Sequence, residues 1–112
     1  MSWTPEAHKR AVERVFSGPR TFALILEDGT EYADGPRAAG TLSLPLNQGG
    51  VWRVCNEEAV EFAPFARTAE QHVTAIAVYA GPIRLALIPT APVAVSDRVQ
   101  VVLRPGELWV GA

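Results

Sequence analysis

Cys55 and His72 are two residues whose types could in principle form a pair for nucleophilic catalysis. A cysteine attacks as its thiolate and needs a nearby base, and His8 and His72 are the only histidines. Cys55 ends the apolar run VWRVC, where a cysteine usually behaves as a small hydrophobic side chain. With a single cysteine, no intrachain disulfide and no thiolate metal cluster can form. We therefore expect no catalytic role for Cys55 and surface positions for both histidines.

Two groups of carboxylates have residue types that bind cations or cleave glycosidic bonds. One group surrounds a turn and the other lies on an alternating run: Glu27, Asp28, Glu31 and Asp34, then Glu57, Glu58 and Glu61. The spacing of an EF-hand loop is missing, and so are the glycine patterns of a P-loop and of a dinucleotide-binding turn. We interpret these acids as solvated residues beside turns, and we expect no metal, no cofactor and no enzymatic activity.

Tryptophans and arginines are the residues best suited to a contact surface. Nine of the ten basic residues are arginine, whose planar head group suits protein interfaces, although GC-rich coding explains the bias more simply. An exposed tryptophan anchors an interface or stacks on a sugar, whereas a buried one belongs to the core. Both interpretations stay open, because the strand registers are unknown. The candidate interface residues are Trp3, Trp52, Arg53, Arg84 and Trp109.

Length and charge exclude several classes of partner. A chain of 112 residues with 48% hydrophobic and 20% charged residues suits one folded domain, which we place over 1–112. The net charge of −2 gives no electrostatic basis for binding nucleic acid. No apolar run approaches the roughly 20 residues that cross a bilayer. The N-terminus has no signal-peptide pattern, so we expect folding in a cytoplasm and no membrane partner.

A single helix is predicted over residues 4–17. Thr4 suits the N-cap and Pro5 the first helical position. Gly18 suits the left-handed residue after the helix, and Pro19 prevents its continuation. One apolar stripe runs along the segment: Ala7, Ala11, Val12, Val15 and Phe16.

After Pro19 the apolar period changes from 3.6 to 2, which indicates strands. The run 20–26 places Phe22, Leu24 and Leu26 on one face. The run 41–46 does the same for three leucines, with a proline on the other face. The run 73–79 is apolar on both faces and rich in β-branched residues, so it predicts a central strand.

Pro89 and Pro92 separate a strand over 83–88 from one over 93–95, because proline cannot donate to a ladder. Turn signals recur every eight to twelve residues, and no second helix is available as a crossover. We therefore predict an all-β domain with strands across 20–110, an antiparallel β-sandwich or jelly roll of about eight strands after one helix. The remaining predicted strands cover 51–55, 57–62, 99–103 and 108–110.

The order of these segments resembles the small β-sandwich proteins of tailed bacteriophages known as minor tail or tail-fibre-like proteins. Such proteins open with a short helix and an apolar strand, then continue through "I-x-F" and "VTHxGI(F/Y)" strands. The matching segments here are 11–16, 22–26, Glu31-Tyr32-Ala33 with Arg37, 60–62 and 73–79, followed by 85–87, Pro92, Val93, Asp97, Val99, Val101, Gly106, Leu108 and Val110. This chain departs from the pattern at Ala75, where the family has histidine, and at Ser96, where it has glycine.

The resemblance implies a non-enzymatic virion protein of the tail or its tip, whose partners are other virion proteins and copies of itself. Small sandwiches also decorate capsids, and the sequence does not separate the two locations. A third hypothesis is a module that binds host surface glycans through Trp52 or Trp109. Because exposed strand edges need cover, we also expect self-association as a trimer or larger closed assembly.

Overall fold

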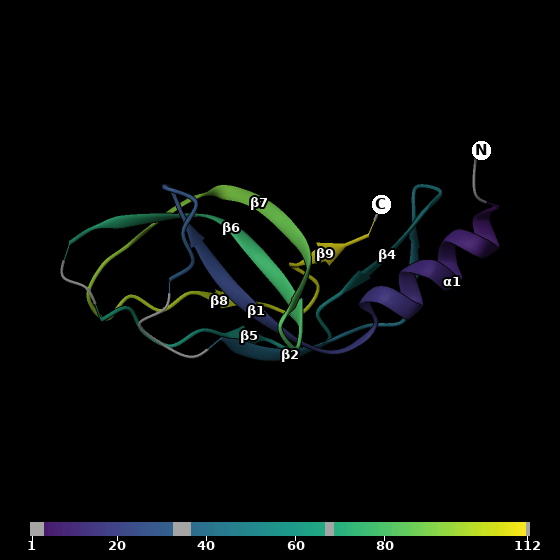
Figure 1. Ribbon diagram of the computed structural model, residues 1–112, viewed down its shortest axis with the longest axis horizontal. Helices are drawn as coiled ribbons and strands as arrows, with labels where there is room; N and C mark the ends of the chain where they lie inside the picture. The colour runs from purple at the N-terminus through teal and green to yellow at the C-terminus, as the bar shows by residue number, and fades with distance from the viewer. Residues whose placement is uncertain (1–3, 33–36, 67–68, 112) are drawn as a thin grey trace.

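The protein is an all-β sandwich with one N-terminal helix, 49 × 26 × 24 Å in extent (Figure 1). The computed structural model describes residues 4–32, 37–66 and 69–111. No helix in these ranges is long and apolar enough to span a membrane. The elements in chain order are α1 (Pro5–Phe16), β1 (Gly18–Leu26), β2 (Ala38–Leu42), β3 (Leu46–Gln48), β4 (Val51–Cys55), β5 (Val60–Glu61), β6 (Gln71–Ala80), β7 (Ile83–Val95), β8 (Val102–Leu103) and β9 (Trp109–Val110).

Helix α1 confirms the prediction over 4–17 and projects from one end of the sandwich (Figure 1). The Thr4 side chain accepts a hydrogen bond from the Ala7 N–H at 3.1 Å, which satisfies one of the free amides of the first turn. At the other end, Arg20 donates to the Val15 carbonyl at 2.8 Å. A cation at this end also complements the helix dipole. The helix packs on β4 through the buried Val12.

The larger sheet is antiparallel with the strand order β2-β1-β6-β7. Strand β6 lies between β1 and β7, as the two-sided apolar run 73–79 predicts. Phe22, Leu24 and Leu26 of β1 all turn into the core, which confirms their predicted common face. Burying each such side chain contributes about 1.5–3 kcal/mol to folding.

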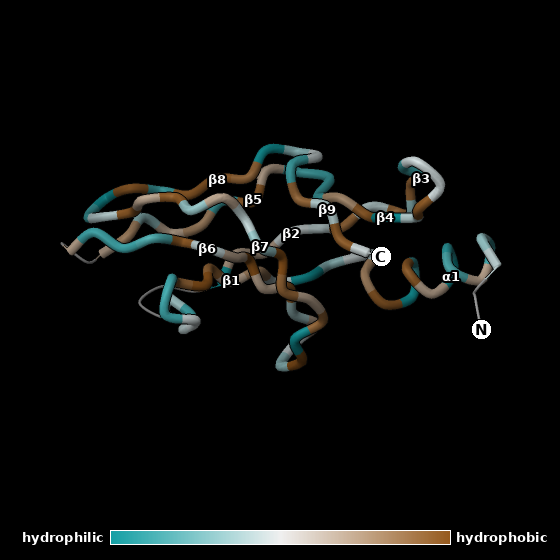
Figure 2. The backbone as a smooth tube through the Cα atoms, turned by 90° about the horizontal axis from the view of Figure 1, so that it is seen from above, coloured by the Kyte–Doolittle hydropathy of each residue, from teal (hydrophilic) through white to brown (hydrophobic). Residues whose placement is uncertain are grey.

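The second layer is built from two short sheets, β3-β4-β9 and β5-β8 (Figure 2). The second layer is connected to the larger sheet beside β2. The Ser43 N–H donates to the Cys55 carbonyl at 2.8 Å, and the Glu57 N–H donates to the Thr41 carbonyl at 3.0 Å. Backbone hydrogen bonds therefore join the two layers on this side of the sandwich.

The prediction of one continuous strand over 41–46 is wrong. Strand β2 ends at Leu42, and β3 begins only at Leu46. Leu42 is buried, but Leu44 is 65% exposed and Leu46 is 47% exposed, while Pro45 is buried. The chain leaves the larger sheet at Ser43 to join β4, so the period of two does not continue across this crossing.

The predicted break between 83–88 and 93–95 is also wrong, because β7 runs unbroken through Pro89 and Pro92. The register with β6 shifts between Val73 and Ala75, where β7 contains extra residues. An edge strand tolerates proline when the missing N–H would have faced away from the sheet. The prolines therefore mark β7 as an edge strand rather than ending it.

Asn56 joins the two halves of the second layer and is only 1% exposed. Its side-chain amide donates to the carbonyls of Glu58 and Arg104, each at 2.8 Å. Its side-chain oxygen accepts from the Leu108 N–H at 3.0 Å, and its backbone carbonyl accepts from the Gly106 N–H at 3.0 Å. This one residue therefore ties the β4–β5 junction to the chain between β8 and β9.

Asn56→Asp is expected to lower the free energy of unfolding by about 3 kcal/mol at pH 7, because a buried carboxylate would face two carbonyl oxygens. Urea unfolding followed by circular dichroism measures the loss. Gln48→Glu, which adds a charge at an exposed position of β3, serves as the control and should change stability by less than about 0.5 kcal/mol. Equal stability of the Asn56→Asp variant and the wild type would contradict the assigned hydrogen bonds.

Candidate functional site

The structure does not bring the candidate nucleophile and base together. Cys55 lies on β4 beside Ser43, with 3.7 Å between Sγ and the hydroxyl oxygen. His72 lies on β6 in the other layer, 3.7 Å from a Glu27 carboxylate oxygen. A nucleophile requires its base within hydrogen-bond reach, which this arrangement does not supply.

One acid from the first predicted group belongs to a polar cluster on the outer face of the larger sheet. The Arg37 guanidinium donates two hydrogen bonds of 3.0 Å to the Glu31 carboxylate. Arg37 also stacks 3.7 Å from the centre of the Tyr79 ring. The Tyr79 hydroxyl donates to Glu31 at 3.3 Å and accepts from Arg84 at 3.2 Å. Each of the four polar groups of this cluster thus has at least one partner within it.

The remaining predicted acids form no metal centre in the described part of the chain, where no three histidine, cysteine or carboxylate side chains gather. Asp34, assigned to the first group, lies outside the described residues. Glu57, Glu58 and Glu61 are all exposed.

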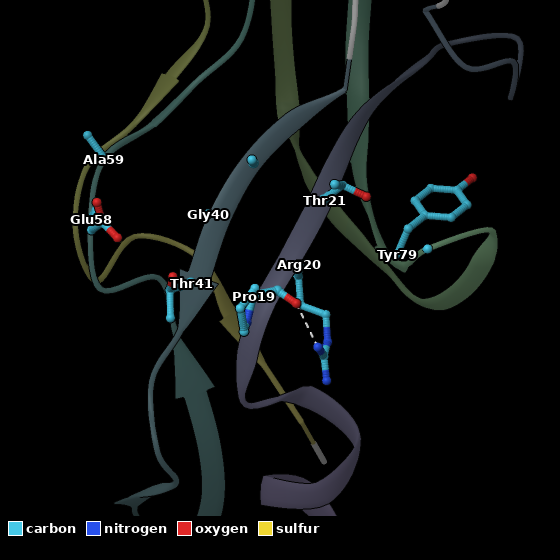
Figure 3. Close-up of a pocket in the computed structure, with 10 residues that line it drawn as sticks. Pro19, Arg20, Thr21, Gly40, Thr41, Glu58, Ala59 and Tyr79 are labelled. Carbon is cyan, nitrogen blue, oxygen red and sulfur yellow. Dashed lines mark hydrogen bonds between the residues drawn. The ribbon is translucent and has the colours of Figure 1, made fainter.

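A shallow hollow of about 450 Å³ lies over β1 and β2 (Figure 3). Its polar side chains do not converge. Arg20 turns toward α1 and donates to the Pro19 carbonyl at 2.6 Å, while Tyr79 points away from Glu58 on the far side of β2. Because acid–base catalysis needs groups within reach of one reacting atom, this hollow is a poor candidate for chemistry.

The side of the sandwich opposite β2 is open. Within the described part of the chain, β7 pairs only with β6, and residues 99–111 pair only with β4, β5 and the segments beside them. Among the described residues no backbone hydrogen bond joins β7 to β8 or β9. We call the space between β7 and residues 99–111 the seam, and two free strand edges border it.

The alternation of hydrogen bonds across the sheet fixes which groups of β7 face this seam. In antiparallel strands the N–H and C=O of one residue point to one side, and those of the next residue point to the other. The Leu24 carbonyl accepts from the Tyr32 N–H at 2.9 Å, away from β6. Ala23 must therefore bond toward β6, where its register partner is Ala77.

By the same alternation, Ile76 bonds toward β7, where its register partner is Ile88. Leu87 therefore turns its N–H and C=O to the free edge. Pro89 occupies the next outward position, where the missing N–H of proline removes no hydrogen bond to β6. The edge thus keeps a donor at Leu87 and lacks one at Pro89.

The half of the seam nearest α1 forms an open groove of about 510 Å³, which we call the Trp109 groove. Phe16 at the end of α1 lies at one end, and β7 and β9 form the walls. Its lining is apolar apart from Arg53 of β4: Phe16, Arg53, Ala86, Leu87, Ile88, Pro89, Trp109, Val110 and Gly111. A second hollow of about 470 Å³ continues the seam between β7 and β8, above Val73 and Ile76.

Apolar side chains remain exposed along the whole seam. Leu87 is 49% exposed, and the others are Val93, Val99 and Val102, which range from 38% to 43%. Single exposed aliphatic residues are ordinary, but a row of them beside a free strand edge is a typical feature of a contact surface. The seam is therefore the candidate functional site.

The predicted interface residues separate into three places. Arg53 and Trp109 line the same groove. Trp52 packs against the core with the Lys9 ammonium 4.8 Å from its ring centre, and Arg84 belongs to the cluster with Tyr79. Trp3 lies outside the described residues.

The chain matches no protein-family model, and no curated protein or solved structure shows a significant similarity to it. The seam and the polar cluster must therefore be interpreted from their own geometry.

The sequence contained a signal for the seam that the strand prediction did not use. No charged residue occurs between Leu85 and Val95, and two prolines lie in the same run. An apolar strand that contains proline is typical of an edge. The Glu31–Arg37–Tyr79 cluster had no comparable signal, because Tyr79 is distant along the chain from the other two residues and meets them through the register of β1 and β6.

Glu31→Gln is expected to reduce the pH dependence of stability below neutrality. Hydrogen bonds from Arg37 hold the pKa of the Glu31 carboxyl below its usual value. A carboxyl whose pKa is lower in the folded state stabilises the protein above its unfolded pKa, and this stability disappears as the pH falls through the folded pKa. The variant should therefore lose less than about 1 kcal/mol at pH 7 and nothing at strongly acidic pH.

Urea unfolding at a series of pH values measures this difference. Glu61→Gln, at an exposed position of β5, is the matched control. A wild type and a Glu31→Gln variant with parallel pH profiles would contradict the role given to the Arg37 contact.

Proposed function

We propose that this chain is a non-enzymatic structural protein that works by docking on other proteins through its seam. The observation that carries the proposal is the pair of free strand edges that border an apolar groove. Isolated edges of this kind promote aggregation, so proteins keep them where another chain covers them or where they are short and interrupted. A groove lined by one arginine and by aromatic and aliphatic residues also has the composition of an interface centre.

The arrangement of titratable groups supports a role without catalysis. Cys55 and His72 lie in different layers, and the described residues of the Trp109 groove include no carboxylate, histidine or cysteine. Glu31 is held in the charged form by Arg37, which keeps the pKa of its carboxyl below the usual value and so away from neutral pH. General acid–base catalysis favours groups whose pKa lies near the working pH.

Within this class we propose a minor tail or tail-tip component of a tailed bacteriophage. The support is the order of segments along the sequence, together with a sandwich of the kind that the resemblance implies. A capsid decoration protein would use the same kind of contact surface on the head, so the two roles differ in location. The glycan-binding alternative has weaker support, because Lys9 covers Trp52 and Trp109 is half-buried in the groove.

Intact particles from a lysate of cells that carry the gene should contain the chain, and labelled antibody should mark their tails in electron micrographs. Labelling of the head would replace the tail role by decoration. Purified particles without the chain, judged by mass spectrometry beside known virion proteins, would contradict the virion proposal.

Trp109→Ala is expected to reduce incorporation into particles at least about tenfold, because truncating an aromatic anchor in a groove typically costs 2 kcal/mol or more of binding. The measurement is the ratio of the chain to the major particle protein after complementation with the variant gene. Leu44→Ala is the control, because Leu44 is exposed but lies outside the groove lining. Equal incorporation of the two variants would contradict docking through the groove.

A further inference from the structure

Arg53 is a cation without a counter-charge in the Trp109 groove. Its Nε is buried and has no hydrogen-bond partner, and among the described residues no carboxylate lies within ion-pair distance of it. A buried guanidinium donor left without an acceptor lowers stability. An arginine without a counter-charge is suited to a ligand that brings a carboxylate, because a carboxylate matches the planar geometry of the guanidinium group best.

The backbone of β7 adds a second requirement to the same groove. Leu87, which lines it, turns one N–H donor and one C=O acceptor outward. An extended peptide that adds to a sheet edge satisfies both groups at once. A sugar or a lipid chain offers no repeating pair of donor and acceptor at this spacing.

The apolar walls of the groove indicate which side chains the ligand needs at its other positions. Phe16, Ile88 and Val110 present apolar surface into the groove. Alternate side chains of an extended peptide point to one side, so every second residue of the ligand would lie on this surface. One of the side chains near Arg53 would be acidic.

We propose that the Trp109 groove binds an extended segment of a different protein, with apolar residues at alternate positions and one carboxylate paired with Arg53. The segment bonds to the Leu87 backbone and lies between β7 and β9. This inference rests on the proposed docking function and names the chemistry of the partner.

A second copy of this chain does not supply such a segment through its own free edge. Strand β7 contains one charged residue, Arg84, and no acid. Pro89 and Pro92 also remove two donors from it. Pairing of two β7 edges would leave both Arg53 side chains without a carboxylate, so the groove favours a partner of different sequence.

Selection from a displayed library of random peptides about ten residues long, which span roughly 33 Å when extended, tests this on the immobilised full-length chain. Enriched peptides should alternate apolar residues and contain Asp or Glu at one position. Peptides with an acidic residue at that position should be enriched at least about tenfold more than in the same selection on the Arg53→Gln variant. A tenfold change corresponds to about 1.4 kcal/mol of binding free energy.

Two further variants separate the parts of the site. Arg53→Lys keeps the charge without the planar fork and should retain only part of the acidic preference. Leu87→Pro removes the outward N–H but leaves the bonds to β6, and it should weaken binding of every selected peptide. Thermal unfolding of each variant confirms that the fold is intact before selection.

The proposal is overturned if no peptide is enriched, if the enriched peptides lack an acid, or if the acidic preference persists on Arg53→Gln. These outcomes are independent of the particle experiments. A chain that selects acidic strands but is missing from particles would refute the virion role alone, and the reverse result would refute the peptide site alone.

Discussion

The hydrogen bonds of Asn56 are the interaction on which the second layer depends. Strands β5, β8 and β9 contain two residues each, too few to hold a sheet together by their own ladders. Asn56 compensates by bonding the carbonyls of Glu58 and Arg104 and the amide of Leu108 from one buried position. Its amide offers donors and an acceptor together, which no charged or apolar side chain of this size does. The position of β9, and therefore of Trp109, follows from these bonds.

The sandwich is closed on one side and open on the other, and the strand lengths explain the difference. On the β2 side, backbone hydrogen bonds at Ser43 and Glu57 join the layers. On the opposite side, β7 is 13 residues long and faces two strands of two residues each, which cannot match its length. Pro89 and a register shift further limit pairing along β7. The apolar seam is the consequence of this incomplete closure, and the same incompleteness makes it available to a partner.

The sequence predicted those features that depend on local chemistry. Thr4, Pro5 and Gly18 marked the helix, and the two-sided apolar run 73–79 marked the central strand. The features it did not predict depend on the arrangement of distant segments. The break after Leu42 arises because the chain crosses between layers, and β7 continues through Pro89 because that residue faces a free edge. Arg53 and Trp109 were both named as interface residues, but only the pairing of β4 with β9 brings them into one groove.

Docking at the seam requires that the outer edge of β7 is free, and amide hydrogen exchange of Leu87 measures whether it is. Two-dimensional NMR of the isotope-labelled chain resolves the exchange of neighbouring amides under native conditions. We predict that the Leu87 amide exchanges at a rate close to that of an unprotected peptide, while the Ile88 amide, bonded toward β6, is strongly protected. Equal protection of these two amides would mean that the edge is already paired, and the seam could not then be a docking site.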